Sequence, residues 1–341
     1  MVSAGQSLDT RAVGAYLKDK LPGFEAPFTA TKFEGGQSNP TFLLETAASN
    51  YVLRRKPPGD LLKSAHAVDR EFRVQSALAD SEVPVARMHL LCQDVSVIGS
   101  DFYVMDHVPG RNFHEPTLDD LDAAERGKVI DDMNRVLAAL HQVDTDSVGL
   151  GDYGPPGHYI ARQVSRWTKQ YRASETDPVP DMDRLIARLT EELPEDDGQR
   201  TLVHGDYRID NMIFAVSAPQ CVAVLDWELS TLGHPYADLA SVIMQWQLPP
   251  GKEGRGLAGI ERAARGLPSD EAFIAAYCTR RGIGEIANFG YFVAFCFFRM
   301  AAIIQGVLRR ALDGNASNPK RAMQLGAYVP LFASNGLRAL P

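Results

Sequence analysis

The segment "LVHGDYRIDNMIF", residues 202–214, places several polar side chains between two short apolar runs. His204, Asp206, Asp210 and Asn211 would be costly to bury without hydrogen-bond partners. The segment is therefore either an ordinary surface turn or a loop whose polar groups meet at a site. The neighbouring sequence decides between these two interpretations.

The spacing of the polar groups favours a site. Asp206 and Asn211 lie five residues apart, and Asp226 follows at the end of the apolar run "VAVLD". Phosphoryl transfer needs a carboxylate that accepts the proton of an attacking hydroxyl, and an amide oxygen and second carboxylate that hold Mg²⁺ against the phosphates. The catalytic loop of kinases supplies these groups as Asp-x-x-x-x-Asn followed by a metal-binding Asp. Because the same order recurs here, we favour phosphoryl transfer over a solvated turn.

Length and composition limit the class of protein and the kinds of partner that are expected. The 341 residues are 45% hydrophobic and 23% charged, which is typical of a soluble globular protein with two domains or two lobes. With 43 acidic against 35 basic residues, the formal charge is -8. That balance argues against a nucleic-acid partner over much of the surface. Any anionic ligand must be held by local positive charge.

Several other classes of protein are disfavoured by local patterns. The four cysteines are scattered without a CxxC pair, so neither a zinc site nor a disulfide framework is expected. Residues 1–20 lack the apolar core of a secretory signal, and we expect a cytoplasmic protein. The apolar stretch 291–308 is interrupted by Arg299 and is short for a membrane span, so a buried helix and no membrane partner are expected.

The N-terminal third has the pattern of a small α+β lobe. Residues 28–56 contain three strand-like runs separated by polar turns, residues 64–79 have helical spacing, and residues 102–108 are again extended. The later part is mainly helical. Its first helix follows Asp119 or Asp120, either of which could be its cap. The exceptions are "MIFAVS" and "CVAVLDWE", which flank Pro219 and predict a hairpin.

One sequence match does not indicate the function with which it is usually associated. "GLGDYG", residues 149–154, satisfies the GxGxxG pattern of dinucleotide-binding proteins. It follows "VDTDSV" rather than a strand and continues into "PPG" rather than a helix, so it offers no helix N-terminus to a pyrophosphate. We expect a loop there.

The N-terminal lobe also offers phosphate-binding groups. In "EGGQSNPT", Gly35 and Gly36 lie between two strands, where backbone N–H groups and the Ser38 hydroxyl could approach phosphates; a plain hairpin turn is the alternative. "YVLR" places the cation Arg54 at the end of the third strand, where protein kinases carry a lysine that pairs with a helix glutamate. Glu71 is the expected partner.

The choice of cation remains open in this segment. Arginine keeps the charge of the kinase lysine but changes its geometry. Arg55 or Lys56 could take the role if the register of the strand differs.

Together these motifs resemble the aminoglycoside phosphotransferase family of small-molecule kinases. The resemblance rests on "GGQSN", "VLR", "DREFRV", "FYVMDHVPG", "GDYRIDN", "LDWE" and "GHPYADLA" and covers most of the chain. It implies an α+β, bilobal, protein-kinase-like fold with a small β-rich N-lobe and a larger, mainly helical C-lobe. The expected divisions are a nucleotide-binding lobe over residues 1–105, a hinge over 106–110, and a catalytic and substrate lobe over 111–341.

The resemblance implies ATP and Mg²⁺ as cofactors and assigns roles to individual residues. Asp206 would be the catalytic base, and Asn211 and Asp226 would hold the metal. Asp238 would brace the catalytic loop, and His204 would be a structural hydrogen-bonding residue. Contacts to ATP are expected from Gly35, Gly36, Ser38, Arg54, Glu71, and the backbone of Met105 to His107.

A closer resemblance, to one branch of this family, implies a class of substrate. "VLRRKPPGDLLKSAHAVDREFRV" and "VLDWELSTLGHPYADLA" are similar to the kinase part of certain acyl-CoA dehydrogenase fusion proteins and their bacterial relatives. That branch implies phosphorylation of a hydroxyl of 4-hydroxyacyl-CoA thioesters. An apolar stretch near the C-terminus slightly favours the same substrate, because it contains Arg299, Arg309 and Arg310. The alternatives are an aminoglycoside or other amino-alcohol kinase and a non-catalytic nucleotide-binding protein.

Overall fold

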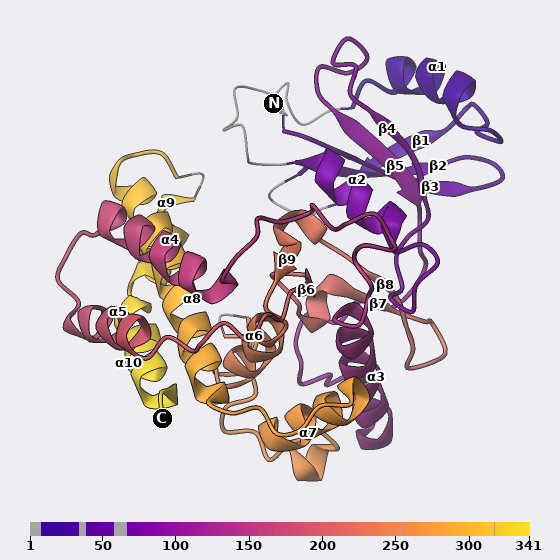
Figure 1. The fold of residues 1–341 in the computed structure, drawn as a ribbon. Helices are drawn as coiled ribbons and strands as arrows, with labels where there is room; N and C mark the ends of the chain where they lie inside the picture. Colours follow the sequence, from indigo (N-terminus) through magenta and orange to yellow (C-terminus); the bar gives the residue numbers. More distant parts are fainter. Residues whose placement is uncertain (1–7, 34–38, 58–66, 253, 317) are drawn as a thin grey trace. The chain divides into compact units, whose positions relative to one another are not determined.

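A computed structural model describes residues 8–33, 39–57, 67–252, 254–316 and 318–341 (Figure 1). The chain divides into two compact units. The first comprises Met1–Phe113, Asp146–Leu150 and Ile209–Ser230, and the second comprises His114–Thr145, Gly151–Arg208 and Thr231–Pro341.

A five-stranded antiparallel sheet forms the centre of the first unit. Its strands are β1 (Thr29–Lys32), β2 (Thr41–Glu45), β3 (Asn50–Arg55), β4 (Met88–Cys92) and β5 (Phe102–Asp106), in the order β1-β2-β3-β5-β4. The three strands expected within residues 28–56 and the strand within 102–108 are therefore confirmed. The helix expected within residues 64–79 is also present, as α2 (Val68–Ala77).

The two faces of this sheet are covered by different apolar clusters. Leu53 of β3 packs with Val13 and Leu17 of α1 (Thr10–Lys20), whereas its neighbour Val52 packs with Val68 of α2. Successive side chains of a strand point to opposite faces. The same alternation assigns the two arginines that follow in β3 to different environments.

The later segment Ile209–Ser230 belongs to the first unit because it pairs with it. The short helix η1 (Ile209–Asn211) leads into β7 (Met212–Phe214), which forms a hairpin with β8 (Cys221–Val224), as expected. Phe214 pairs with Arg111, and the Val224 N–H donates to the carbonyl of Pro84.

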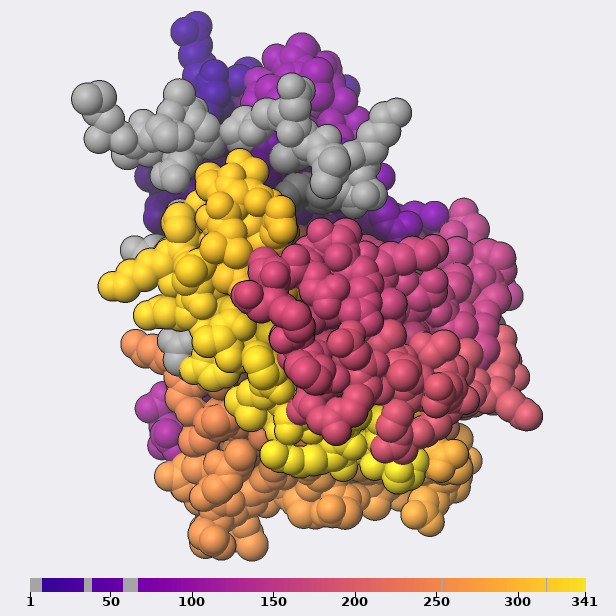
Figure 2. All heavy atoms as spheres, turned by 90° about the vertical axis from the view of Figure 1, so that its left-hand side faces the viewer, coloured from indigo at the N-terminus to yellow at the C-terminus, as the bar shows by residue number. Residues whose placement is uncertain are grey.

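The second unit is mainly helical. Its helices include α3 (Ala123–Leu140), α4 (Tyr159–Ser174), α5 (Pro180–Glu191), α6 (Tyr236–Trp246), α7 (Asp270–Arg281), α8 (Phe289–Leu312), α9 (Pro319–Gly326) and α10 (Val329–Ala339). A small sheet pairs β6 (Thr201–Val203) with β9 (Thr231–Gly233). Figure 2 shows α4 and α5, in rose, beside the C-terminal helices in yellow, in agreement with the packing of α4 on α8 and of α5 on α10.

The cap expected for α3 was assigned to the wrong aspartate. Asp122, not Asp119 or Asp120, caps the helix by accepting a 2.8 Å hydrogen bond from the Glu125 N–H. The chain turns before the helix, with Leu118 at φ 49°, and the Asp119 carboxylate forms an ion pair with Arg265.

Helix α8 is the buried helix expected over residues 291–308. It is long and apolar enough to cross a membrane, but 72% of its most apolar window is buried within the protein. It packs against α4, α6, α9 and α10. A core position explains its composition.

The "GLGDYG" segment and the four cysteines have the structural roles expected of them. Residues 149–154 form turns, and α4 begins only at Tyr159, so "GLGDYG" is a loop as expected. All four cysteines are buried thiols: Cys92 and Cys221 in the first unit, Cys278 and Cys296 in the second. Burial raises the pKa of Cys278, and that of Cys296 to about 12.

Candidate active site

The loop that carries Asp206 begins where β6 ends. Gly205 has φ 85°, a left-handed conformation that glycine adopts without strain, and it turns the chain sharply before Asp206. Asp238, in the first turn of α6, accepts hydrogen bonds from the backbone N–H groups of His204 (2.6 Å) and Gly205 (2.9 Å). These are the bracing contacts expected of Asp238.

His204 has a structural environment, as expected. Its side chain is completely buried, and its Nδ1 lies 3.2 Å from the backbone nitrogen of Asp206, which donates to it. The ring therefore fixes the backbone next to the Asp206 carboxylate. A buried acid and a buried imidazole together hold the loop in one conformation.

Asp238 is ionised despite being only 1% exposed. Burial raises its pKa, but the hydrogen bond from His141 and the N–H groups of the loop outweigh burial, so the pKa is lowered. His141 Nε2 lies 3.4 Å from the Asp238 carboxylate, and its Nδ1 lies 2.7 Å from the Tyr277 hydroxyl. Burial lowers the pKa of His141, which favours the neutral imidazole.

Two arginines surround the Asp206 loop. The Nε of Arg208 lies 3.3 Å from the Asp206 carboxylate, whose side chain is 31% exposed. Arg299 of α8 donates from Nη2 to the carbonyl of Gly205 at 3.3 Å. The loop thus presents a partly exposed carboxylate, balanced by a neighbouring cation, on a backbone fixed from both sides.

In the first unit, the β7–β8 hairpin brings Asn211 and Asp226 close to one another. The Leu225 N–H donates to the carbonyl of Asn211 at 2.8 Å, so the residue before Asp226 is tied to Asn211 itself. The Asn112 side chain donates to the carbonyls of Asp210 and Met212, both at 2.9 Å, and holds the turn. Asp226 follows β8 and precedes the short helix η2 (Trp227–Leu229) in a left-handed conformation, with φ 64°.

The donor groups of this hairpin suit Mg²⁺. The ion prefers oxygen ligands and is typically held by one or two carboxylates together with phosphates and water. An amide oxygen from Asn211 and a carboxylate from Asp226 are such a set. Asp226 is 36% exposed at its side chain, so its carboxylate can reach a ligand.

Arg54 links the helix glutamate to the hairpin. Its Nε lies 2.8 Å from Glu71, and its Nη2 donates to Asp226 at 2.9 Å. Glu71 is 1% exposed and also accepts from Asn39 (2.7 Å) and from the Tyr103 hydroxyl (3.0 Å). The expected Arg54–Glu71 pair is therefore present, and it extends to the expected metal ligand.

The two alternative cations lie elsewhere. Arg55 is only 5% exposed, and its guanidinium lies 5.7 Å from the centre of the Phe42 ring. Lys56 forms an ion pair with Asp101. Strand alternation puts Arg54, and not Arg55, on the face of the sheet that carries α2.

The remaining expected ATP contacts are described only in part. Gly35, Gly36 and Ser38 lie outside the described residues. The N–H of Asp106 donates to Arg87, and that of His107 donates to Asn50. The N–H groups of Asp106 and His107 are thus already used within the sheet region.

The chain is similar to several known proteins. Residues 29–282 match the model of the phosphotransferase enzyme family. The chain belongs to this family. Among its relatives, acyl-CoA dehydrogenase family member 11 of Mus musculus is 44% identical over 340 residues, which is 97% of this chain and 43% of that protein. The phosphotransferase chain thus spans less than half the length of this relative.

Solved structures show the same fold. The crystal structure of a candidate aminoglycoside phosphotransferase from Ralstonia eutropha is 43% identical, with a TM-score of 0.89 over 98% of both chains. An aminoglycoside phosphotransferase with AMP-PNP and hygromycin B is 15% identical, with a TM-score of 0.61 over 96% of this chain and 98% of that one. Spectinomycin phosphotransferase with ADP and spectinomycin is 13% identical, with a TM-score of 0.66 over 98% and 99%. The phosphotransferase therefore has the expected α+β, protein-kinase-like fold.

Sequence reasoning did not identify several residues of the site. Arg208 and Tyr103 were not singled out, and Arg299 was noted only as a charge in an apolar stretch. An arginine inside a buried helix was the available signal for Arg299, because such a cation needs a nearby partner. No local pattern indicates that Asn39 and Tyr103 meet Glu71.

Proposed function

We propose that this phosphotransferase is an ATP- and Mg²⁺-dependent kinase that transfers the γ-phosphoryl group to a hydroxyl of a small molecule, a 4-hydroxyacyl-CoA thioester. The observation that carries the proposal is the anchoring of the Asp206 loop. Two backbone N–H groups are fixed by buried Asp238, and Asp206 follows directly. Such preorganisation suits a catalytic carboxylate better than a surface turn.

In this proposal Asp206 accepts the proton of the acceptor hydroxyl as the hydroxyl attacks the γ-phosphorus. Asn211 and Asp226 would hold Mg²⁺, which would neutralise charge on the phosphates. Arg54, fixed by Glu71, orients Asp226 and offers its remaining N–H donors to the phosphates. The retention of Asp206, Asn211 and Asp226 disfavours a nucleotide-binding protein without catalysis.

The acyl-CoA acceptor is supported by the relative from Mus musculus, whose name places it among acyl-CoA dehydrogenases. An aminoglycoside acceptor is the second candidate, because the structure from Ralstonia eutropha is named for that activity and shares 43% identity. The net charge of -8 would also attract a polycation.

The two acceptors are separated by a direct comparison. We would measure kcat/KM for a 4-hydroxyacyl-CoA and for kanamycin under the same Mg-ATP conditions, following ADP release. The acyl-CoA proposal expects the thioester to be preferred. A preference for kanamycin of about tenfold or more, roughly 1.4 kcal/mol of transition-state stabilisation, would overturn it.

A further inference from the structure

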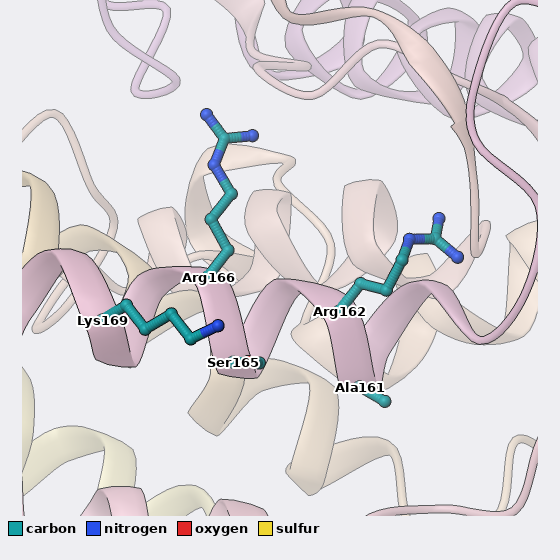
Figure 3. Close-up of a pocket in the computed structure, with 5 residues that line it drawn as sticks. All are labelled: Ala161, Arg162, Ser165, Arg166 and Lys169. Atoms are coloured by element: carbon teal, nitrogen blue, oxygen red, sulfur yellow. The ribbon is translucent and has the colours of Figure 1, made fainter.

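A basic pocket lies along α4 in the second unit (Figure 3). Its volume is about 630 Å³, and it is lined by Ala161, Arg162, Ser165, Arg166 and Lys169. These residues recur at the spacing of successive helical turns, so they share one face of the helix. Figure 3 shows Arg162 and Arg166 projecting from the same side of α4, Lys169 lying along the helix, and the short side chains of Ala161 and Ser165 at the edge away from the two arginines.

Within the described part of the chain, no carboxylate neutralises the charges of the pocket. Among the described residues, no acidic side chain forms an ion pair with Arg162, Arg166 or Lys169. Arg172, farther along the same helix, does form ion pairs with Glu175 and Asp183. In a chain of net charge -8, three positive side chains that no described carboxylate pairs with favour an anionic ligand.

The pocket is partly rigid. Arg162 donates to the carbonyls of Pro155 (3.2 Å) and Pro156 (2.6 Å), and also to that of Gly157, so it is fixed to the loop that leads into α4. Arg166 and Lys169 are exposed. The fixed arginine therefore shapes one end of the pocket, and the two exposed cations are available to a ligand.

Packing connects the start of α4 to the Asp206 loop. The Tyr159 ring lies so close to Gly233 that a Cβ there would be 2.8 Å from the ring. Gly233 ends β9, which pairs with β6, and β6 leads directly into His204, Gly205 and Asp206. Helix α4 also packs on α8, whose Arg299 contacts Gly205. The pocket and the proposed base thus belong to one continuous packed structure.

We propose that this pocket binds phosphate groups of the acceptor, those of the nucleotide part of a CoA thioester. The inference rests on the proposed function. A guanidinium makes paired hydrogen bonds to phosphate, and an ammonium supplies a compact point charge. The long pantetheine arm of CoA allows the phosphates to bind at a distance from the reacting hydroxyl. The same three cations would repel an aminoglycoside, so the pocket favours the acyl-CoA acceptor.

The test compares acceptors with and without these phosphates. Kinetics would be measured for the 4-hydroxyacyl-CoA and for the same acyl group on pantetheine, with the wild type, the double variant Arg166→Ala/Lys169→Ala, and Arg172→Ala as the matched control. We expect the double variant to raise KM for the CoA thioester about tenfold, roughly 1.4 kcal/mol, with kcat retained. KM for the pantetheine thioester should not change, and Arg172→Ala should behave as the wild type.

Binding would be measured separately from catalysis. Calorimetry with adenosine 3′,5′-bisphosphate, in the presence of Mg-AMP-PNP to occupy the nucleotide site, should show binding to the wild type that weakens as salt is raised. The double variant should bind at least tenfold more weakly. Absence of binding to the wild type, or equal binding by both proteins, overturns the inference.

The outcomes distinguish the two proposals. If the wild type phosphorylates the CoA thioester and the double variant does so with unchanged KM, the pocket inference is wrong and the proposed function stands. If the double variant loses activity equally with both thioesters, the loss does not depend on phosphates and the inference is also wrong. If the wild type phosphorylates neither thioester, the proposed acceptor is wrong, and the calorimetry alone decides whether the pocket binds phosphates.

Discussion

Asp206 is the single side chain on which the proposed chemistry depends most. We expect Asp206→Asn to lower kcat by about 10²–10⁴-fold, because the amide cannot accept the proton of the acceptor hydroxyl. Affinity for Mg-ATP should stay within a few-fold of wild type, since the base acts on the acceptor. ADP release and calorimetry check the two halves of this prediction. Asp177→Asn, at an exposed aspartate of the same unit, is the control. Near-normal turnover by Asp206→Asn would remove Asp206 from the role of base.

Arg54 makes two contacts that a lysine cannot reproduce together. Its Nε faces Glu71 and its Nη2 faces Asp226, from one planar group. We expect Arg54→Lys to weaken Mg-ATP binding and to lower the free energy of unfolding by about 1–3 kcal/mol, because one carboxylate loses its partner. Calorimetry and thermal unfolding are the measurements. Arg87→Lys, at an exposed arginine of the same unit, should change neither quantity. Equal behaviour of the two variants would show that the double contact is unimportant.

For individual residues, the sequence predicted those contact partners that lie in recognisable local motifs. The Arg54–Glu71 pair followed from a cation at a strand end and a glutamate in the next helix. Arg299 and Gly205 are 94 residues apart in the chain, and no motif joins them. Contacts of this kind depend on how helices pack, which a single sequence does not specify.

Helix α6 and the Asp206 loop are coupled through one carboxylate. We expect Asp238→Asn to lower both kcat and the unfolding temperature, because an amide has one acceptor oxygen for two backbone N–H groups. Leaving a buried N–H without an acceptor costs about 1–3 kcal/mol. Steady-state kinetics and thermal unfolding test this. Asp181→Asn, also an acidic residue in a first helical turn, is the matched control. An unchanged kcat in Asp238→Asn would show that the loop holds its conformation without this anchor.

Elements with strong periodicity were predicted well, and their ends less well. The strands of residues 28–56, helix α2 and the β7–β8 hairpin follow from local patterns. The cap of α3 did not, because Asp119, Asp120 and Asp122 all suit an N-cap by residue type. The turn at Leu118 and the Asp119–Arg265 ion pair determine which aspartate is used. Strands β6 and β9 have three residues each, too few for a detectable alternation.

The stability of the whole protein should depend on pH through buried histidines. Burial lowers the pKa of His141 and of His234 from the ordinary 6.5. As pH falls below about 6.5, the unfolded chain takes up protons at these histidines before the native protein does. The free energy of unfolding should therefore fall with pH in that range. The lowered pKa of Asp238 acts only in a more acidic range, below its ordinary 3.8.

Thermal unfolding between about pH 8 and 5 tests this dependence, with the histidine pKa of about 6.5 as the expected upper limit of the loss. His141→Gln should show a shallower decline, because one of the two imidazoles with a lowered pKa is removed. His114→Gln, at an exposed histidine of the same unit, should retain the wild-type slope. A wild-type stability that is constant down to pH 5 would contradict the prediction.

The fold class was predictable because its motifs are spread along most of the chain and agree with the periodicities around them. Which segments of the chain belong to which unit was harder to predict from the sequence. Residues 209–230 join the first unit through Phe214 and Arg111 and through Val224 and Pro84. These are backbone contacts between distant segments, and backbone groups carry no signature in the amino-acid sequence.

The four buried cysteines give the protein built-in chemical reporters. A thiol reacts with an alkylating reagent only when it is exposed and ionised, so each cysteine is labelled mainly during transient opening of its surroundings. Two of the thiols belong to each unit. Labelling rates followed by mass spectrometry therefore record the opening of each unit separately, without an introduced probe. A ligand that slows labelling of Cys92 and Cys221 acts on the first unit, and one that protects Cys278 and Cys296 acts on the second.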